Sequence, residues 1–365
     1  MTARPPAGYG YVPAANLPSV APRPTLRDVA TQAGVHPATA SRALNEATRS
    51  LVRPATVARV REVAAALGYQ VNPIARSLKT SRSETVGVLV PDLTNPLFPP
   101  IVRGIEDALA DNGYTVLTAN TDNDPARTSS NFGAMLARQV DGFIVATALL
   151  EDPFLHEAAA RGVPMVMVNR QTEHLDVSVV AGDDATGIER TVDHLVELGH
   201  TDIAHIAGPL QVSTGAVRLR AFRAAMQLHG LRSDRIVEAD AYSEAAGRTA
   251  LLQLLGDDRP TAVVAGNDLL ALGCYDALAE TGLCCPADLS IVGFNDMPFI
   301  SRLQPPLTSV RVPQYELGVE AARLLLDRLS GRTVTPRVVL LPVRLVVRGS
   351  TAPPPATKRP ARPAG

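Results

Sequence analysis

Residues 25–45 read TLRDVATQAGVHPATASRALN and decide the fold of the N-terminal part of the chain. Apolar residues recur at helical spacing in the first half, which predicts a helix from about residue 26 to residue 33. Gly34 supplies the left-handed position that glycine adopts without strain. Pro37 suits the first turn of a second helix over residues 37–44, because its missing N–H would have no partner there. The stretch therefore predicts two short helices joined by a tight turn, a shape that fits the major groove of DNA.

The second predicted helix has a polar outer face. Ala40, Ala43 and Leu44 would point inward, which leaves hydroxyl groups and one arginine outside. Hydroxyls can contact phosphates, and an arginine such as Arg42 can bind guanine O6 and N7 together, so Arg42 is the main candidate for base readout. The alternative is an ordinary helical hairpin with a solvated polar face. The residues expected to contact DNA from this region are Thr25, Pro37, Ala38, Thr39, Ser41, Arg42 and Asn45.

Two predicted helix starts carry unusual N-cap residues, His36 and Arg53. A Ser, Thr or Asp side chain would serve better there, and its absence costs about 1 kcal/mol. A cationic Arg53 also opposes the helix dipole unless a phosphate lies nearby. Either DNA supplies the missing interactions, or the residues at these surface positions have changed by neutral drift because the positions tolerate substitution.

Two more helices follow, at residues 54–67 and residues 72–80. The first is amphipathic and is ended by Gly68. The second, NPIARSLKT, is basic and too short to be stable alone, but it could fold against a copy of itself on DNA. Its residues expected to contact DNA are Ala75, Arg76, Leu78 and Lys79.

Charge is distributed unevenly along the 365 residues, although the net charge is only −1. Arginine and lysine outnumber acidic residues between residues 23 and 82, and the remainder is acidic. This asymmetry suits a phosphate-binding head on a nearly neutral body.

From residue 84 onward, apolar strand-like runs alternate with amphipathic helical segments. VGVLV at residues 86–90 is the first run and LSIVG at residues 289–293 is the last. This alternation predicts parallel sheets covered on both faces by helices. The strands are too many for one sheet, so we expect two similar lobes with a cleft at the carboxyl ends of the strands. Helices are expected at residues 97–112, 127–138, 153–161, 186–198, 217–229, 245–255 and 269–280.

Several function classes are disfavoured by what the sequence lacks. Cys274, Cys284 and Cys285 show no metal-ligand spacing, so neither a metal nor a cofactor is predicted. There is no P-loop, G-x-S-x-G or H-E-x-x-H motif, which argues against an enzyme. No apolar run approaches a membrane span, and the N-terminus does not look like a signal peptide, so a cytoplasmic protein is expected rather than a transported-solute receptor.

Taken in order, the motifs resemble those of the LacI/GalR family of bacterial transcription regulators. Residues 25–45 match the family's DNA-reading head, residues 72–80 its hinge helix, and ETVGVLVPDLTNPLF at residues 84–98 its first strand and ligand loop. VDHLVELGH with IAHIAG, AGNDLLALG, and SIVGFNDMPFISRLQPPLTSVRVPQYELG match later segments.

The resemblance implies an all-α helix-turn-helix head with a hinge helix, joined to an α/β core of two lobes built on parallel sheets, similar to periplasmic binding proteins. It implies a homodimeric repressor that binds a near-palindromic double-stranded operator, with Leu78 wedged into the minor groove, and that responds to a small effector. No membrane partner is implied. The expected organisation is a disordered arm (1–24), the head (25–71), hinge and linker (72–83), the two-lobed core (84–349) and a disordered tail (350–365).

The effector pocket departs from the family pattern. Ala216 stands where sugar-binding members commonly have an arginine, Asn295 where they have an aspartate, and Val312 where they have a glutamine. Arg218 matches a second arginine that is not expected to face the ligand. We therefore expect a largely neutral pocket. It binds a different neutral molecule, such as a nucleoside or a large glycoside, or binds an ordinary sugar through other groups, or is vestigial. The residues expected to contact the ligand are Asp92, Asn95, Phe98, Asn169, Tyr242, Asn267 and Asn295.

Overall fold

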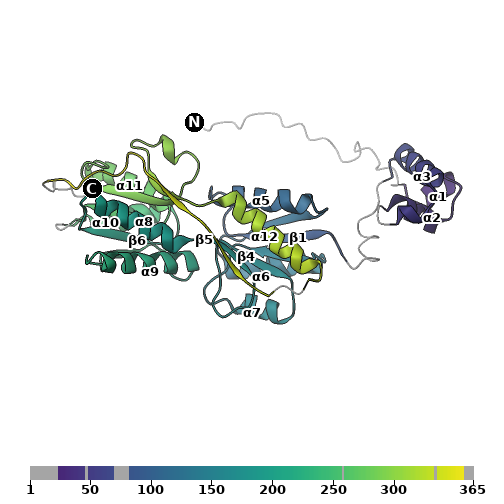
Figure 1. The fold of residues 1–365 in the computed structure, drawn as a ribbon, viewed down its shortest axis with the longest axis horizontal. Coiled ribbons are helices and arrows are strands. Elements are labelled where there is room, and N and C mark those ends of the chain that lie inside the picture. Colours follow the sequence, from purple (N-terminus) through teal and green to yellow (C-terminus); the bar gives the residue numbers. More distant parts are fainter. Residues whose placement is uncertain (1–23, 46–47, 70–81, 257–258, 333–334, 357–365) are drawn as a thin grey trace, which may run out of the picture. The chain divides into compact units, whose positions relative to one another are not determined.

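The computed structural model describes residues 24–45, 48–69, 82–256, 259–332 and 335–356. The chain divides into two compact units, Met1–Ser81 and Arg82–Gly365, which differ in architecture (Figure 1). The described part of the first unit is helical, and the second combines helices with two sheets.

The first unit packs its helices around a small apolar core. They are α1 (Leu26–Gln32), α2 (Pro37–Leu44), a 3-10 turn η2 (Arg49–Leu51) and α3 (Pro54–Leu67). Gly34 and Gly68 have φ angles of 63° and 64°, so both occupy the left-handed positions predicted from the sequence. The core consists of Val29, Ala30, Ala33, Ala40, Ala43, Val60 and Ala64.

The N-caps of α2 and α3 behave differently. His36 caps α2, because its Nδ1 accepts a hydrogen bond from the backbone N–H of Ala38 at 3.2 Å. The prediction that His36 is a poor cap was therefore wrong, since a neutral imidazole nitrogen can replace a carboxylate or hydroxyl oxygen. Arg53 makes no side-chain cap bond to α3, as the sequence predicted.

The second unit contains two six-stranded sheets, each of which defines a lobe (Figure 1). The strand orders are β11-β5-β4-β3-β1-β2 in lobe one and β12-β10-β9-β8-β6-β7 in lobe two. All pairs are parallel except β10 with β12. The chain crosses between the lobes after β5, after β10 and after β11, which agrees with the predicted parallel two-lobed core.

Lobe one consists of β1 (Thr85–Val90), β2 (Thr115–Asn120), β3 (Gly142–Val145), β4 (Met165–Val168), β5 (Val179–Gly182), β11 (Val338–Leu341), α5 (Phe98–Ala110), α6 (Pro125–Ala137), α7 (Pro153–Ala160) and α12 (Gln314–Leu329). Lobe two consists of β6 (Ile203–Ala207), β7 (Ile236–Glu238), β8 (Ala262–Ala265), β9 (Ser290–Asn295), β10 (Thr308–Arg311), β12 (Arg344–Val346), α8 (Asp184–Glu197), α9 (Ser213–Leu228), α10 (Glu244–Leu254), α11 (Asp268–Thr281) and the 3-10 turn η3 (Ile300–Arg302).

Both faces of each sheet are covered because the buried strands are apolar on both sides. In β1, Val86, Val88 and Val90 join one core cluster, whereas Leu89 joins another on the opposite face. The first cluster includes residues of α5 and α12, and the second includes residues of α6 and α7. This period-two division fixes which residues of each strand pack under which helices.

Helix α9 begins at Ser213, four residues before the start at 217 expected from the sequence. The first turn reads Ser-Thr-Gly, which is poor in apolar periodicity, and tertiary packing overrides that local signal. A Cβ on Gly215 would overlap the carbonyl oxygen of Pro209, so glycine permits this close approach. The extra turn carries Thr214 to the pocket described below.

Candidate DNA-binding face and effector pocket

The surface of α2 matches the expected DNA-reading face. Ala40 and Ala43 are buried, whereas Ala38 and Arg42 are exposed and lie four residues apart on one side of the helix. The remaining candidates Pro37, Thr39, Ser41 and Asn45 are half-buried.

Thr25 has a structural role at the start of α1. Its hydroxyl accepts from the Asp28 N–H at 3.3 Å, and its own N–H donates to Asp28 Oδ2 at 2.7 Å, which forms a capping box. Thr25 is nevertheless exposed, so DNA contact stays a prediction. The hinge candidates Ala75, Arg76, Leu78 and Lys79 lie outside the described residues.

A pocket lies between the two lobes at the carboxyl ends of their strands. Six of the seven predicted ligand contacts line it, which are Asn95, Phe98, Asn169, Tyr242, Asn267 and Asn295. Its wall also includes Leu97, Arg170, Thr214 and Arg218, which were not predicted from the sequence to contact the ligand.

Asp92 is not among the residues that line this pocket. Its Oδ1 accepts from the backbone N–H of Thr94 at 2.8 Å and from the Thr94 hydroxyl at 2.6 Å. The carboxylate is therefore engaged in a local turn. Ligand contact by Asp92 stays a prediction.

The cleft is closed in this conformation. The pocket has a volume of about 20 Å³, which is room for little more than one water molecule. Hydrogen bonds between described residues cross from lobe to lobe beside it. The N–H of Leu150 donates to the Gln211 carbonyl at 2.9 Å, and the N–H of Gln171 donates to Ser213 Oγ at 3.0 Å. A ligand can enter only if the lobes separate or pocket side chains move.

The pocket amides are held by the ends of strands and helices. Asn267 is the N-cap of α11 and its Oδ1 accepts from the Leu270 N–H at 2.9 Å. Asn169 and Asn295 have φ angles of 64° and 109°, which only a minority of non-glycine residues adopt. The Oδ1 atom of Asn295 is buried without a hydrogen-bond partner among the described residues. Asn295 therefore offers a free acceptor at the pocket wall.

The two pocket arginines differ in their partners. Arg218 is 3% exposed, and its Nε and Nη2 donate to Asp184 at 2.9 and 3.2 Å. Its Nη1 donates to the Gly266 carbonyl at 2.6 Å, and its guanidinium lies 3.8 Å from the centre of the Phe294 ring. Arg218 is thus fully paired, so it can line the pocket without offering a free charge.

Arg170 has no such acidic partner among the described residues. It is 6% exposed; Nη1 donates to Asn123 Oδ1 at 2.8 Å and Nε has no partner there. Burial lowers the pKa of Arg170 to about 10. The pocket wall is therefore not the largely neutral surface expected from the sequence. The one available signal was that Arg170 directly follows Asn169 at the end of a strand.

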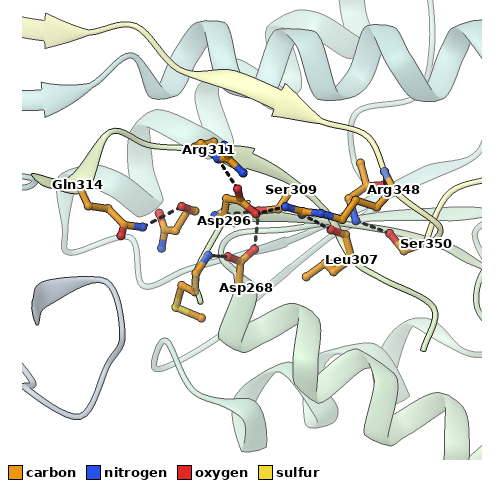
Figure 2. A network of polar contacts seen from close by, with 11 residues as sticks. Asp268, Asp296, Leu307, Ser309, Arg311, Gln314, Arg348 and Ser350 are labelled. Atoms are coloured by element: carbon orange, nitrogen blue, oxygen red, sulfur yellow. Dashed lines mark hydrogen bonds and ion pairs between the residues drawn. The ribbon is translucent and has the colours of Figure 1, made fainter. Parts of the chain in front are cut away.

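A polar network includes Asp268 and Asp296, which directly follow Asn267 and Asn295 in the sequence (Figure 2). Asp268 has no exposed surface, and its carboxylate accepts from the Ser309 hydroxyl at 2.6 Å and the Met297 N–H at 2.7 Å. Burial raises the pKa of Asp268 to about 7. Hydrogen bonds from β10 and from the loop after β9 thus converge on this carboxylate, which lies at the start of α11.

The neighbouring Asp296 extends this network to the segments that cross between the lobes (Figure 2). Its carboxylate accepts from Arg311 Nε at 2.5 Å and from Arg348 Nη2 at 2.6 Å. Gln314, which begins α12 in the other lobe, donates its Nε2–H to the Asn295 carbonyl at 2.9 Å. Pocket residue Asn295 is therefore tied to the crossover between β10 and α12.

This combination defines a class of protein: a helix-turn-helix head followed by a two-lobed core with a polar cleft pocket. Residues 25–72 match the family described as bacterial regulatory proteins, lacI family, and residues 192–351 match a periplasmic binding protein-like domain. Among the described helices, none has both the length and the apolarity needed to cross a bilayer.

Known relatives match over most of this chain. The HTH-type transcriptional repressor CytR of Escherichia coli K12 is 35% identical over 90% of this chain and 96% of its own length. The ribose operon repressor of the same strain is 33% identical over 89% and 99%. A structure of the lac repressor dimer bound to operator and the anti-inducer ONPF has a TM-score of 0.81 and 30% identity, covering 90% of this chain and 99% of that one. The chain therefore belongs to the lacI family of bacterial regulatory proteins and is a DNA-binding transcriptional regulator.

Proposed function

We propose that this protein is a repressor whose operator affinity is controlled by a small hydroxylated ligand bound between the lobes. The observation that carries the proposal is the polar pocket, which both lobes build in a chain that also has a DNA-reading head. The protein binds its ligand without converting it and acts in the cytoplasm, where the chromosome lies. Two copies bind the two halves of a near-palindromic operator.

The ligand class follows from the chemistry of the pocket. Amides donate and accept hydrogen bonds in pairs, so the asparagines suit the hydroxyls of a sugar or glycoside and the polar edges of a nucleoside. The regulated genes would then serve uptake or breakdown of that compound. Relatives support this class, because one solved structure is a CelR–cellobiose complex and another is a lacI-family regulator from Enterococcus faecium with bound ribose.

Control requires that the ligand distinguish between two states of the cleft. The closed pocket has no room for a sugar, so entry must select an open or rearranged state. A shift from mostly bound to mostly free operator needs a differential affinity of about 5 kcal/mol. The hydrogen bond between Gln314 and the Asn295 carbonyl joins the two lobes at their crossover, so a change in the angle between the lobes would strain or break it.

A release assay tests the proposal. The operator recovered from a random duplex pool is held by the full-length protein while single sugars, glycosides, nucleosides, sugar acids and sugar phosphates are added. We expect at least one compound to change the operator Kd by tenfold or more. A set of compounds that bind the protein yet leave the operator Kd unchanged would contradict ligand control.

A further inference from the structure

Arg170 is a buried cation without a counter-charge. Its side chain lines the pocket, and among the described residues its one side-chain hydrogen bond goes to the neutral amide of Asn123 while its Nε has no partner. A buried charge is unfavourable unless it is paired. Arg218 in the same wall shows the usual solution, since it forms two hydrogen bonds with Asp184.

The rest of the pocket wall offers Arg170 no compensation. The described residues that line the pocket include amides, a threonine and a tyrosine but no aspartate or glutamate. Arg218 adds a second positive charge, but Asp184 already balances it. Among the described residues, no protein group in contact with the wall neutralises the remaining positive charge of Arg170.

We propose that the ligand carries an oxyanion, a carboxylate or a phosphate, that pairs with Arg170. A guanidinium binds either group with short charge-assisted hydrogen bonds, and its Nε–H is available for one of them. The unpartnered Oδ1 of Asn295 accepts a hydrogen bond from a hydroxyl group of the same ligand. The ligand class is thus a hydroxylated acid or phosphate ester, such as a sugar acid or sugar phosphate, rather than the neutral compound expected from the sequence.

This inference rests on the proposed function, because it specifies the ligand of the same pocket. The probes are matched compounds that differ by one oxyanion: glucose, glucuronate and glucose 6-phosphate; ribose and ribose 5-phosphate; and inorganic phosphate alone. Calorimetry on the full-length protein gives the Kd of each. We expect at least one anionic probe to bind ten times more tightly than its neutral parent, and the carboxylate and phosphate arms identify which oxyanion fits.

Substitutions of Arg170 test whether its charge binds the oxyanion. Arg170→Gln keeps hydrogen-bonding capacity but removes the charge, so it should reduce the preference for the anionic probe at least tenfold. Arg170→Lys keeps the charge and should retain part of the preference. Arg220→Gln removes an exposed arginine of α9 and should change nothing. In ligand-free protein, Arg170→Met should leave Tm unchanged or raise it, because an uncompensated buried charge is lost.

The inference would be overturned by equal binding of neutral and anionic probes, by an unchanged preference in Arg170→Gln, or by no binding of any oxyanion probe. A large fall of Tm in ligand-free Arg170→Met would also overturn it, because Arg170 would then be structural. If a neutral sugar or nucleoside releases the operator while oxyanions do not bind, the proposed function stands and only the charge assignment fails.

Discussion

Asp268 is fully buried and directly follows pocket residue Asn267, and its pKa near 7 makes it sensitive to pH in the physiological range. Because the pKa is higher in the folded than in the unfolded protein, folding favours the protonated form. The contribution of protonated Asp268 to the free energy of unfolding is fully present below about pH 4 and is lost as the pH rises through about 7.

Asp268→Asn tests this titration, because the amide keeps the shape but cannot ionise. Between pH 5 and 8, the wild-type should lose more stability than the variant, by on the order of 1 kcal/mol or more. Thermal unfolding of both proteins across this range measures the difference. Parallel pH profiles would show that Asp268 does not titrate there.

Arg42 is the exposed arginine on the reading face of α2. Arg42→Ala should remove about 1–3 kcal/mol of discrimination between operator and random duplex, because a bidentate guanine contact is lost. Salt-dependent nonspecific binding should remain, since other basic residues supply it. Competition binding measures both quantities, with the exposed Arg59→Ala on α3 as the control. Specificity retained in Arg42→Ala would reject the assignment.

At the scale of elements, the long periodic segments were predictable and the strained or close-packed ones were not. α2 and α3 begin and end at the predicted residues, because proline and glycine mark their ends. The start of α9 was missed since its first turn is set by packing at Gly215. Asn169 was predicted as a pocket residue. The charge of the wall could not be predicted, because it depends on the three-dimensional fact that Asp184 pairs with Arg218 while no described carboxylate pairs with Arg170.

Helices α5 and α12 come from distant parts of the chain but pack side by side through glycines (Figure 1). A Cβ on Gly104 would overlap the Tyr315 carbonyl, and one on Gly318 would overlap the Ile101 carbonyl. Gly104→Ala should therefore destabilise the core by about 1–3 kcal/mol.

Gly133→Ala on α6 is the matched control, because its Cβ would meet no atom within 4 Å. That change should stabilise the helix by about 0.5–1 kcal/mol. Denaturant unfolding measures the change in the free energy of unfolding for each variant. The two changes have opposite signs if the contact between α5 and α12, rather than helix propensity, determines the effect of Gly104→Ala. A stabilising Gly104→Ala would be inconsistent with the close approach of α5 and α12.

At the scale of the whole core, the closed cleft depends in part on the bond from Gln171 N–H to Ser213 Oγ. Ser213→Ala should weaken closure by about 0.5–1.5 kcal/mol, the net value of one such hydrogen bond. Small-angle scattering of the ligand-free protein should then report a larger radius of gyration. Ser330→Ala removes an exposed hydroxyl that bonds only within lobe one and serves as the control. Identical scattering of Ser213→Ala and wild-type would show that this bond does not hold the lobes.

We infer that the head and core together form a dimeric, sequence-specific DNA-binding regulator. Selection of binding sites from a random duplex pool by the purified full-length protein, at near-physiological salt, tests it most directly. We predict a near-palindromic motif whose centre is a flexible pyrimidine–purine step, as expected if Leu78 opens that step. A motif without two-fold symmetry, or binding without any sequence preference in the presence and absence of pooled ligands, would contradict it.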